Sequence, residues 1–174
     1  MSDKPFRVVP LDHTYDRNRF DSGSEPLDRY FRERVTQDTR RRVTACFIAL
    51  SVNGRVAGYY TLASASILLR DLPTEIIKKL PRYPSVTAVR MGRLAVDQAF
   101  KGRGLGAALL ADALTRVVRS EIAAYALVVD AKDEQAADFY RHHGFLSTTT
   151  EPLTLFLPLA TAPIAGREKG KMER

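Results

Sequence analysis

The stretch DQAFKGRGLGAALL, residues 97–110, places three glycines directly before an apolar run. Glycine permits the sharp, left-handed backbone of a strand-to-helix turn. After Gly104 the chain reads as a helix that ends near Arg119, with an apolar stripe at Leu110, Ala113, Leu114, Val117 and Val118. The segment 87–96 before the glycines and the nearly continuous apolar run 124–131 after the helix are predicted strands. The handedness of strand–helix–strand units makes these strands parallel neighbours.

The three glycines therefore lie at the start of a predicted helix, where unpaired backbone N–H groups and the positive end of the helix dipole favour an anion. Lys101 and Arg103 add positive charge at the rim. A plain tight turn would need fewer glycines, so the pattern predicts a phosphate site. Gly92, in the middle of the strand 87–96, indicates a bulge or a close approach of a ligand to the backbone.

Two common phosphate-binding motifs do not fit. The loop has no Gly-Lys followed by Ser or Thr, which excludes a Walker loop. Gly102, Gly104 and Ala107 satisfy the dinucleotide pattern G-x-G-x-x-A, and Asp130 ends the next strand where a ribose ligand would lie. However, only 44 residues follow Asp130, too few for the rest of a doubly wound sheet.

Composition predicts one globular domain over residues 1–160 and a flexible basic tail over residues 161–174. The 174 residues carry a formal net charge of +7, with 45% hydrophobic and 27% charged residues, which is typical of a folded protein with an anionic partner. No signal peptide or membrane span is recognisable, so we expect a cytoplasmic protein. The single Cys46 excludes an internal disulfide, and it offers no metal-ligand spacing with the three histidines; we expect no metal.

Other segments complete an α/β fold. Residues 26–42 and 73–80 are predicted helices, and residues 44–52 and 55–68 form a hairpin around Asn53-Gly54. Residues 133–145 form a last helix that ends at Gly144, and residues 150–159 form a last strand.

KGRGLG resembles the pyrophosphate loop of the GNAT acetyltransferases, Q/R-x-x-G-x-G/A, with Lys101 where Gln or Arg is usual. Residues 20–42, 58–67, 80–97 and 124–145 further resemble the GNAT toxins of bacterial type II toxin–antitoxin systems, the TacT-like group. The resemblance covers residues 5–159. It implies a central mixed sheet flanked by helices, a βαβ unit that binds acetyl-CoA, and a homodimer. It also implies an antitoxin partner of the ribbon-helix-helix type.

The resemblance implies acetylation of the α-amino group of aminoacyl-tRNA, which blocks translation. Tyr140 matches the position that donates to the leaving thiolate, and backbone N–H groups at Ala95 and Val96 would stabilise the oxyanion. The expected acetyl-CoA contacts are Ala95, Val96, Lys101, Gly102, Arg103, Gly104, Leu105, Gly106 and Ala107. The residues alone would equally allow Tyr140 to be a core aromatic. No general base is assigned, because Asp97 and Asp130 each suit an ordinary role at a strand end.

In the related toxins a positive surface around the acetyl site holds the tRNA acceptor arm. The basic residues expected to form it here are Lys78, Lys79, Arg82, Arg90 and Arg93. They could also be simply solvated. Two other functions stay open: a GNAT enzyme acting on a protein N-terminus, a lysine or a small amine, and a non-enzymatic domain that binds coenzyme A.

Overall fold

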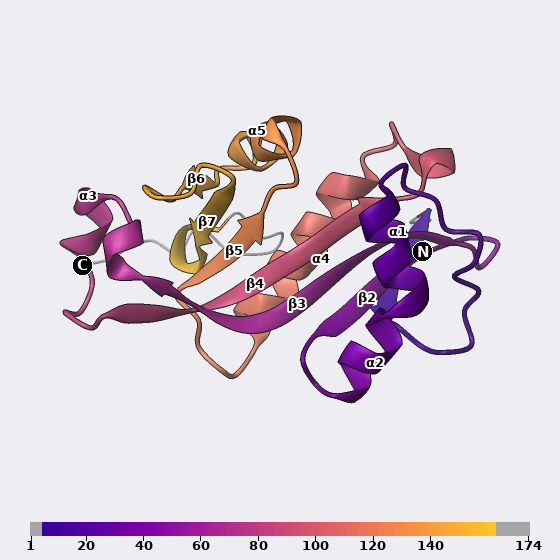
Figure 1. Cartoon of the computed structure of the whole chain (residues 1–174), viewed down its shortest axis with the longest axis horizontal. Coiled ribbons are helices and arrows are strands. Elements are labelled where there is room, and N and C mark those ends of the chain that lie inside the picture. Colours follow the sequence, from indigo (N-terminus) through magenta and orange to yellow (C-terminus); the bar gives the residue numbers. More distant parts are fainter. Residues whose placement is uncertain (1–4, 163–174) are drawn as a thin grey trace.

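One mixed seven-stranded sheet runs through the protein, for which a computed structural model describes residues 5–162 (Figure 1). The strand order is β1-β2-β3-β4-β5-β7-β6, and only β4 and β5 are parallel neighbours. The strands are β1 (Phe6–Pro10), β2 (Ala45–Ser51), β3 (Val56–Leu68), β4 (Ser85–Val96), β5 (Ala126–Asp130), β6 (Leu146–Ser147) and β7 (Thr154–Pro158). The predicted α/β class and the parallel β4–β5 pair are confirmed.

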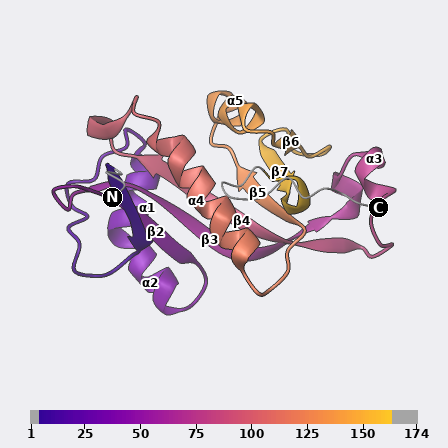
Figure 2. The same ribbon diagram turned by 180° about the vertical axis from the view of Figure 1, so that it is seen from behind.

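Helices cover both faces of the sheet. Helices α1 (Glu25–Glu33) and α2 (Val35–Arg40) lie in front of the sheet in Figure 1, whereas α4 (Leu105–Arg119) crosses the opposite face, which Figure 2 brings forward. The one-turn helix α3 (Thr74–Ile77) lies at the far end of β3 and β4, and α5 (Glu134–His142) lies beside β5. Short 3₁₀ turns span Leu69–Asp71, Gln98–Phe100 and Leu159–Thr161.

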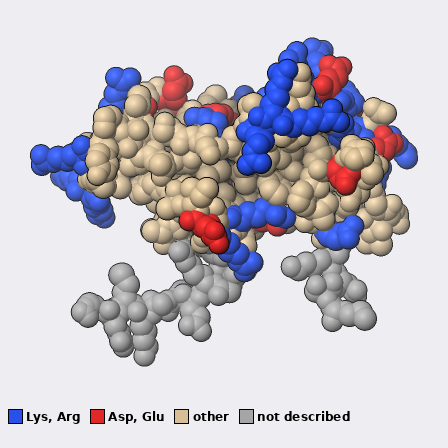
Figure 3. All heavy atoms as spheres, turned by 90° about the horizontal axis from the view of Figure 1, so that it is seen from below, with Lys and Arg blue, Asp and Glu red and all other residues tan. Residues whose placement is uncertain are grey.

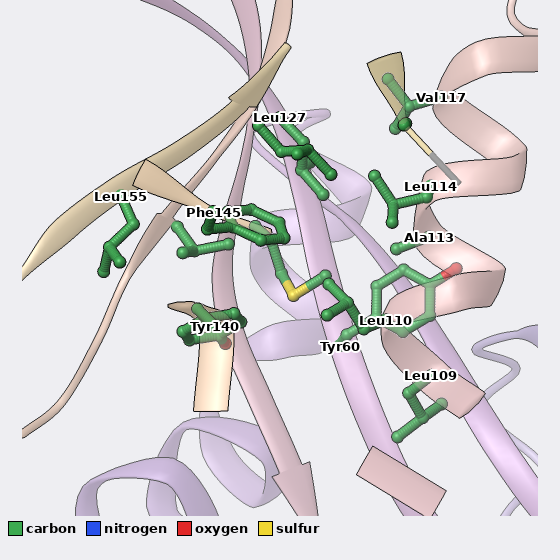
Figure 4. Packing of buried hydrophobic residues seen from close by; sticks show 14 of the residues in the cluster. Tyr60, Leu109, Leu110, Ala113, Leu114, Val117, Leu127, Tyr140, Phe145 and Leu155 are labelled. Atoms are coloured by element: carbon green, nitrogen blue, oxygen red, sulfur yellow. The ribbon is translucent and has the colours of Figure 1, made fainter. Parts of the chain in front are cut away.

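Most of the predicted apolar stripe of α4 lies in the main core. Leu110, Ala113 and Leu114 are buried against side chains of β4, β5 and β7, together with Leu109, which the predicted stripe did not include, as the close view in Figure 4 shows. Val118 is only half-buried. A second core on the opposite face joins α1 to β2 and β3 through the stacked rings of Phe31 and Tyr59, 4.3 Å apart. Burial of these apolar side chains, at roughly 25 cal/mol per Å², holds the helices on the sheet.

Three sequence predictions need correction. The single helix expected over residues 26–42 is two helices, because the backbone turns at Arg34 (φ −119°, ψ −29°) and helicity ends at Arg40. Strands β1 and β6 were not predicted; they are short and lie at the two edges of the sheet. The helix expected over 73–80 is helical only over Thr74–Ile77. The expected tail falls outside the described residues from residue 163 onward, and Ala162 is still buried.

Candidate active site

The strands β4 and β5 pair over only four residues and then separate. Their register runs from Ala88 opposite Ala126 to Met91 opposite Val129. β5 ends one residue later, whereas β4 continues to Val96. On its β5 side, the edge of β4 from Gly92 to Val96 therefore has no strand partner; this unpaired edge, where the two strands separate, is called the opening below.

A bulge in β4 marks the start of this opening. The β3–β4 register shifts between Thr61, opposite Arg93, and Ala63, opposite Arg90. Two β4 residues, Met91 and Gly92, therefore lie opposite one β3 residue, which confirms the bulge expected at Gly92.

The bulge also decides which backbone groups face the opening. The N–H of Asp97 donates to the Ala57 carbonyl at 2.8 Å, so it points toward β3. Because backbone groups alternate along a strand, the N–H groups of Leu94 and Val96 point into the opening, and that of Ala95 points toward β3. Of the two expected oxyanion donors, the geometry thus favours Val96 and adds Leu94. The sequence could not reveal Leu94, because the alternation depends on the position of the bulge.

The glycine-rich loop presents a row of free N–H groups. Gly102 and Gly104 have φ values of +79° and +76°, a conformation that residues with a Cβ rarely adopt. The first backbone bond of α4 runs from the Ala108 N–H to the Gly104 carbonyl. Among residues 5–162, no protein acceptor takes the N–H groups of residues 102–107. These donors at the N-terminus of a 15-residue helix form a cradle for an anion such as a pyrophosphate.

The charged residues of the loop differ in their use. The Lys101 ammonium donates to the Ser22 carbonyl at 2.6 Å, so its side chain ties the loop to the segment before α1. Arg103 is exposed, and its guanidinium lies 5.5 Å from the centre of the Phe100 ring. Arg103 is therefore the loop cation whose side chain is free to reach a bound phosphate.

Tyr140 lies on α5 with its ring in the core, where it packs against Phe145 at 5.5 Å between ring centres (Figure 4). Within residues 5–162, its hydroxyl oxygen has no hydrogen-bond partner, and this oxygen is not completely buried. Burial and the nearby charge of Asp130 raise the pKa of Tyr140 well above its ordinary value. The residue thus combines a fixed ring with a protonated, unpartnered hydroxyl, which suits a proton donor.

The two carboxylates considered as bases are both engaged. Asp97 is 1% exposed and accepts hydrogen bonds from the N–H groups of Asp21 and Ala99, with Arg55 beside it. Asp130 accepts from Arg90 and from the Thr154 hydroxyl. Asp97 therefore holds the end of β4 in place, and both carboxylates already have hydrogen-bond donors within the protein.

The family model described as "Acetyltransferase (GNAT) family" matches residues 10–145. The chain belongs to the GNAT family. It is 37% identical over 160 residues to a tRNA-acetylating toxin of Mycobacterium tuberculosis, covering 91% of this chain and 93% of that relative. It is 27% identical to a probable toxin TacT of Sinorhizobium fredii, covering 88% and 91% of the two chains.

Solved structures of GNAT toxins have the same fold. AtaT complexed with acetyl-methionyl-tRNAfMet matches with a TM-score of 0.82 and 31% identity over 89% of this chain and 95% of AtaT. A tyrosine-to-phenylalanine mutant of KacT matches with a TM-score of 0.85 and 27% identity over 90% and 96% of the two chains. The complex AtaTR has also been solved with acetyl-CoA bound, at 30% identity.

The basic residues expected to hold RNA do not form one cluster in this GNAT protein. Arg90 is paired with Asp130. Lys78 pairs with Glu75, and Lys79 and Arg82 are exposed near α3, at the far end of the sheet from α1. Arg93 lies on β4 under α1. Figure 3 shows further Lys and Arg side chains gathered on the part of the surface where α2 lies in Figure 1, where the sequence carries Arg40, Arg41 and Arg42.

Neither a metal-binding cluster nor a membrane-spanning helix is found within residues 5–162. They contain no group of three or more His, Cys, Asp or Glu residues that could bind a metal ion. None of their helices has the length and apolar character needed to span a membrane.

Proposed function

We propose that this chain is an acetyl-CoA-dependent N-acetyltransferase that acetylates the α-amino group of aminoacyl-tRNA and thereby acts as a toxin. The observation that carries the acyltransferase chemistry is the combination of the free N–H cradle at residues 102–107 with the opening between β4 and β5. The acceptor is proposed from the relatives, one of which is named a tRNA-acetylating toxin, and another of which was solved with acetyl-methionyl-tRNA.

The residues present fit acetyl-CoA, which when bound supplies the activated acetyl group. The cradle N–H groups and Arg103 would hold its pyrophosphate. The Val96 and Leu94 N–H groups would donate to the acetyl oxygen as negative charge develops on it, an arrangement that typically contributes about 2.7–4 kcal/mol per donor. The Tyr140 hydroxyl would give its proton to the departing sulfur, and its raised pKa keeps that proton in place until then.

This acceptor removes the need for a dedicated base. A free α-amine has a pKa of about 7.7–8.0, so an appreciable fraction is already neutral near pH 7.5. A lysine side chain, with a pKa of about 10.4, would require a base to lose its proton. Since Asp97 and Asp130 are both engaged, the site suits an α-amine better than a lysine.

The relatives also support the proposed partners. AtaT has been solved with the C-terminus of its antitoxin AtaR, and KacTA has been solved with DNA. We propose that this chain has a cognate antitoxin. We expect that antitoxin to be of the ribbon-helix-helix type, because the toxin–antitoxin complex would then bind DNA. We also propose that the toxin is a homodimer. A substrate of charged tRNA favours a cytoplasmic enzyme.

The test is transfer of labelled acetyl from acetyl-CoA to a panel of acceptors: aminoacylated tRNA, deacylated tRNA, free amino acids and a lysine peptide. We expect label on the charged tRNA alone, and its loss with Tyr140→Phe. Label on the peptide or a free amine, with charged tRNA unlabelled, would favour the alternative of an ordinary GNAT acetyltransferase. Binding of acetyl-CoA with no transfer to any acceptor would favour the non-enzymatic alternative.

A further inference from the structure

Thr61 differs from the other buried polar side chains of the described chain. Five serine, threonine or aspartate side chains are buried within residues 5–162. Four of them have a hydrogen-bond partner in the protein: Ser22, Asp28, Asp97 and Thr148. The fifth, Thr61, is 1% exposed, and its hydroxyl makes no hydrogen bond with any residue of that range. A buried hydroxyl without a partner lowers stability, so its presence needs an explanation outside the fold.

The hydroxyl of Thr61 lies beside the bulge at which the opening begins. Thr61 is the β3 residue opposite Arg93. A Cβ added to Gly92 would lie 3.6 Å from Thr61 Oγ1 and, apart from its chain neighbours, would meet no other heavy atom within 4 Å. Gly92 is exposed, and the Thr61 oxygen is not completely buried. The missing side chain of Gly92 therefore leaves the Thr61 hydroxyl accessible to a molecule from outside.

Thr61 also points to the face of the sheet from which the acceptor would come. Tyr59 packs in the core under α1, whereas Tyr60 packs in the core under α4 (Figure 4). Because side chains alternate along a strand, Thr61 points to the α1 face, as Tyr59 does. Leu105, the first residue of α4, and Tyr140 both lie in the α4 core. Acetyl-CoA held by the cradle would thus lie on the α4 face, and the α1 face is left for the acceptor.

The position of Thr61 also indicates which atom of the acceptor it would meet. The opening is on the β5 side of β4, whereas Thr61 is on β3, one strand away, at a spacing of about 4.8 Å. An acceptor with its amine in the opening would reach Thr61 with an atom a few bonds from that amine. In aminoacyl-tRNA the carbonyl oxygen of the ester is such an atom, and a hydroxyl can donate to it.

We propose that the Thr61 hydroxyl donates a hydrogen bond to the ester carbonyl of the aminoacyl group and so orients the amine toward the acetyl carbon. The inference rests on the proposed function. Gly92 is needed for this contact, because a side chain there would cover the hydroxyl. The bond exists only when the acceptor is bound, so its loss should affect acetyl transfer and not the stability of the free enzyme.

The test compares Thr61→Val, which removes the hydroxyl, with Thr61→Ser, which keeps it, and with Gly92→Ala, which covers it. Thr148→Val is the matched control, because Thr148 is also buried but its hydroxyl donates to the Glu151 carbonyl at 2.8 Å. Three properties of each variant are measured: the Tm, kcat/KM for aminoacyl-tRNA, and the binding of acetyl-CoA and of deacylated tRNA.

We expect Thr61→Val to lower kcat/KM about three- to tenfold, the usual effect of losing one neutral hydrogen bond. Its Tm should be unchanged or higher, because no bond within the protein is lost. Thr61→Ser should retain most of kcat/KM. Gly92→Ala should lower kcat/KM at least as much as Thr61→Val without a loss of Tm, since Gly92 has no left-handed backbone and a contact of 3.6 Å is ordinary.

The control should show the opposite pattern. Thr148→Val should lose about 2–4 °C in Tm, because the bond to the Glu151 carbonyl is lost, and should keep its kcat/KM. All four variants should bind acetyl-CoA and deacylated tRNA as the unaltered enzyme does, because neither molecule carries the aminoacyl ester.

The proposal would be overturned if Thr61→Val kept its full kcat/KM, or if it lost as much Tm as Thr148→Val, since the hydroxyl would then belong to the fold. Weaker binding of deacylated tRNA or of acetyl-CoA by Thr61→Val would also overturn it, because the contact would then be to the RNA or to the cofactor. Failure of the proposed function looks different: the unaltered enzyme itself would label no charged tRNA, and the inference would fall with it.

Discussion

Gly104→Ala separates the anion cradle from the general stability of the fold. Gly104 is the N-cap of α4 with φ +76°, and a Cβ added there would meet no atom within 4 Å. The cost of the substitution is therefore the left-handed backbone alone, about 1–2 kcal/mol. A protein of this size should lose roughly 2–4 °C in Tm for each kcal/mol.

The chain contains a matched control. Gly54, in the turn between β2 and β3, also has φ +76°, and a Cβ added there would likewise meet open space. Gly54→Ala should thus cost the same amount, about 1–2 kcal/mol, without touching the cradle. If the Gly104 variant relieves its strain by turning the loop, N–H groups leave the cradle. Each bond lost to a pyrophosphate oxygen should weaken acetyl-CoA binding about tenfold or more.

The assay is thermal unfolding of both variants together with calorimetric titration of acetyl-CoA. We expect Gly104→Ala to lose less Tm than Gly54→Ala, because its loop turns to relieve the strain, and we expect weaker acetyl-CoA binding only in Gly104→Ala. A smaller loss of Tm in Gly104→Ala together with unchanged acetyl-CoA affinity would refute the assignment of these N–H groups to the pyrophosphate.

Three further substitutions have distinct expected outcomes. Tyr140→Phe should lower kcat by about 10²–10⁴-fold with unchanged acetyl-CoA affinity. Because burial and Asp130 raise the pKa of Tyr140, the rate of the unaltered enzyme should not fall with rising pH before about pH 10. A fall in the single-turnover rate near pH 8 would contradict the role of Tyr140 as proton donor. Asp97→Asn should cost about 1–3 kcal/mol in denaturant unfolding, because an amide has one acceptor oxygen, and either the Asp21 or the Ala99 N–H would lose its acceptor. A folded but inactive variant would instead indicate that Asp97 is a base. Lys101→Met should lower the free energy of unfolding by about 1 kcal/mol, because the hydrogen bond to the Ser22 carbonyl is lost. The affinity for acetyl-CoA, measured by calorimetry, should be nearly unchanged. A tenfold loss of that affinity would show that Lys101 contacts a phosphate directly.

Local backbone chemistry made the cradle predictable from sequence. Gly102 and Gly104 have the positive φ values that explain their presence, and the stripe that follows them forms α4. The strand–helix–strand unit then required β4 and β5 to be parallel, as they are. These predictions depend on residues that are close together in the chain.

Other features depend on contacts between distant segments and were not predictable. The stacking of Arg93 on Tyr30 joins residues 63 positions apart, one in β4 and one in α1. The pairing of Arg90 with Asp130 follows from the register of two parallel strands. A charge pattern in the sequence cannot distinguish an arginine that has an acceptor in the protein from one that has none.

The most direct test of the central claim is the chemical position of the acetyl group. Charged tRNA treated with enzyme and acetyl-CoA would be digested with a ribonuclease, and the released aminoacyl-adenosine analysed by mass spectrometry. We predict an aminoacyl-adenosine heavier by one acetyl group, carried on the α-amine, and none with Tyr140→Phe. Unmodified aminoacyl-adenosine under conditions where the enzyme consumes acetyl-CoA with another amine would contradict the claim.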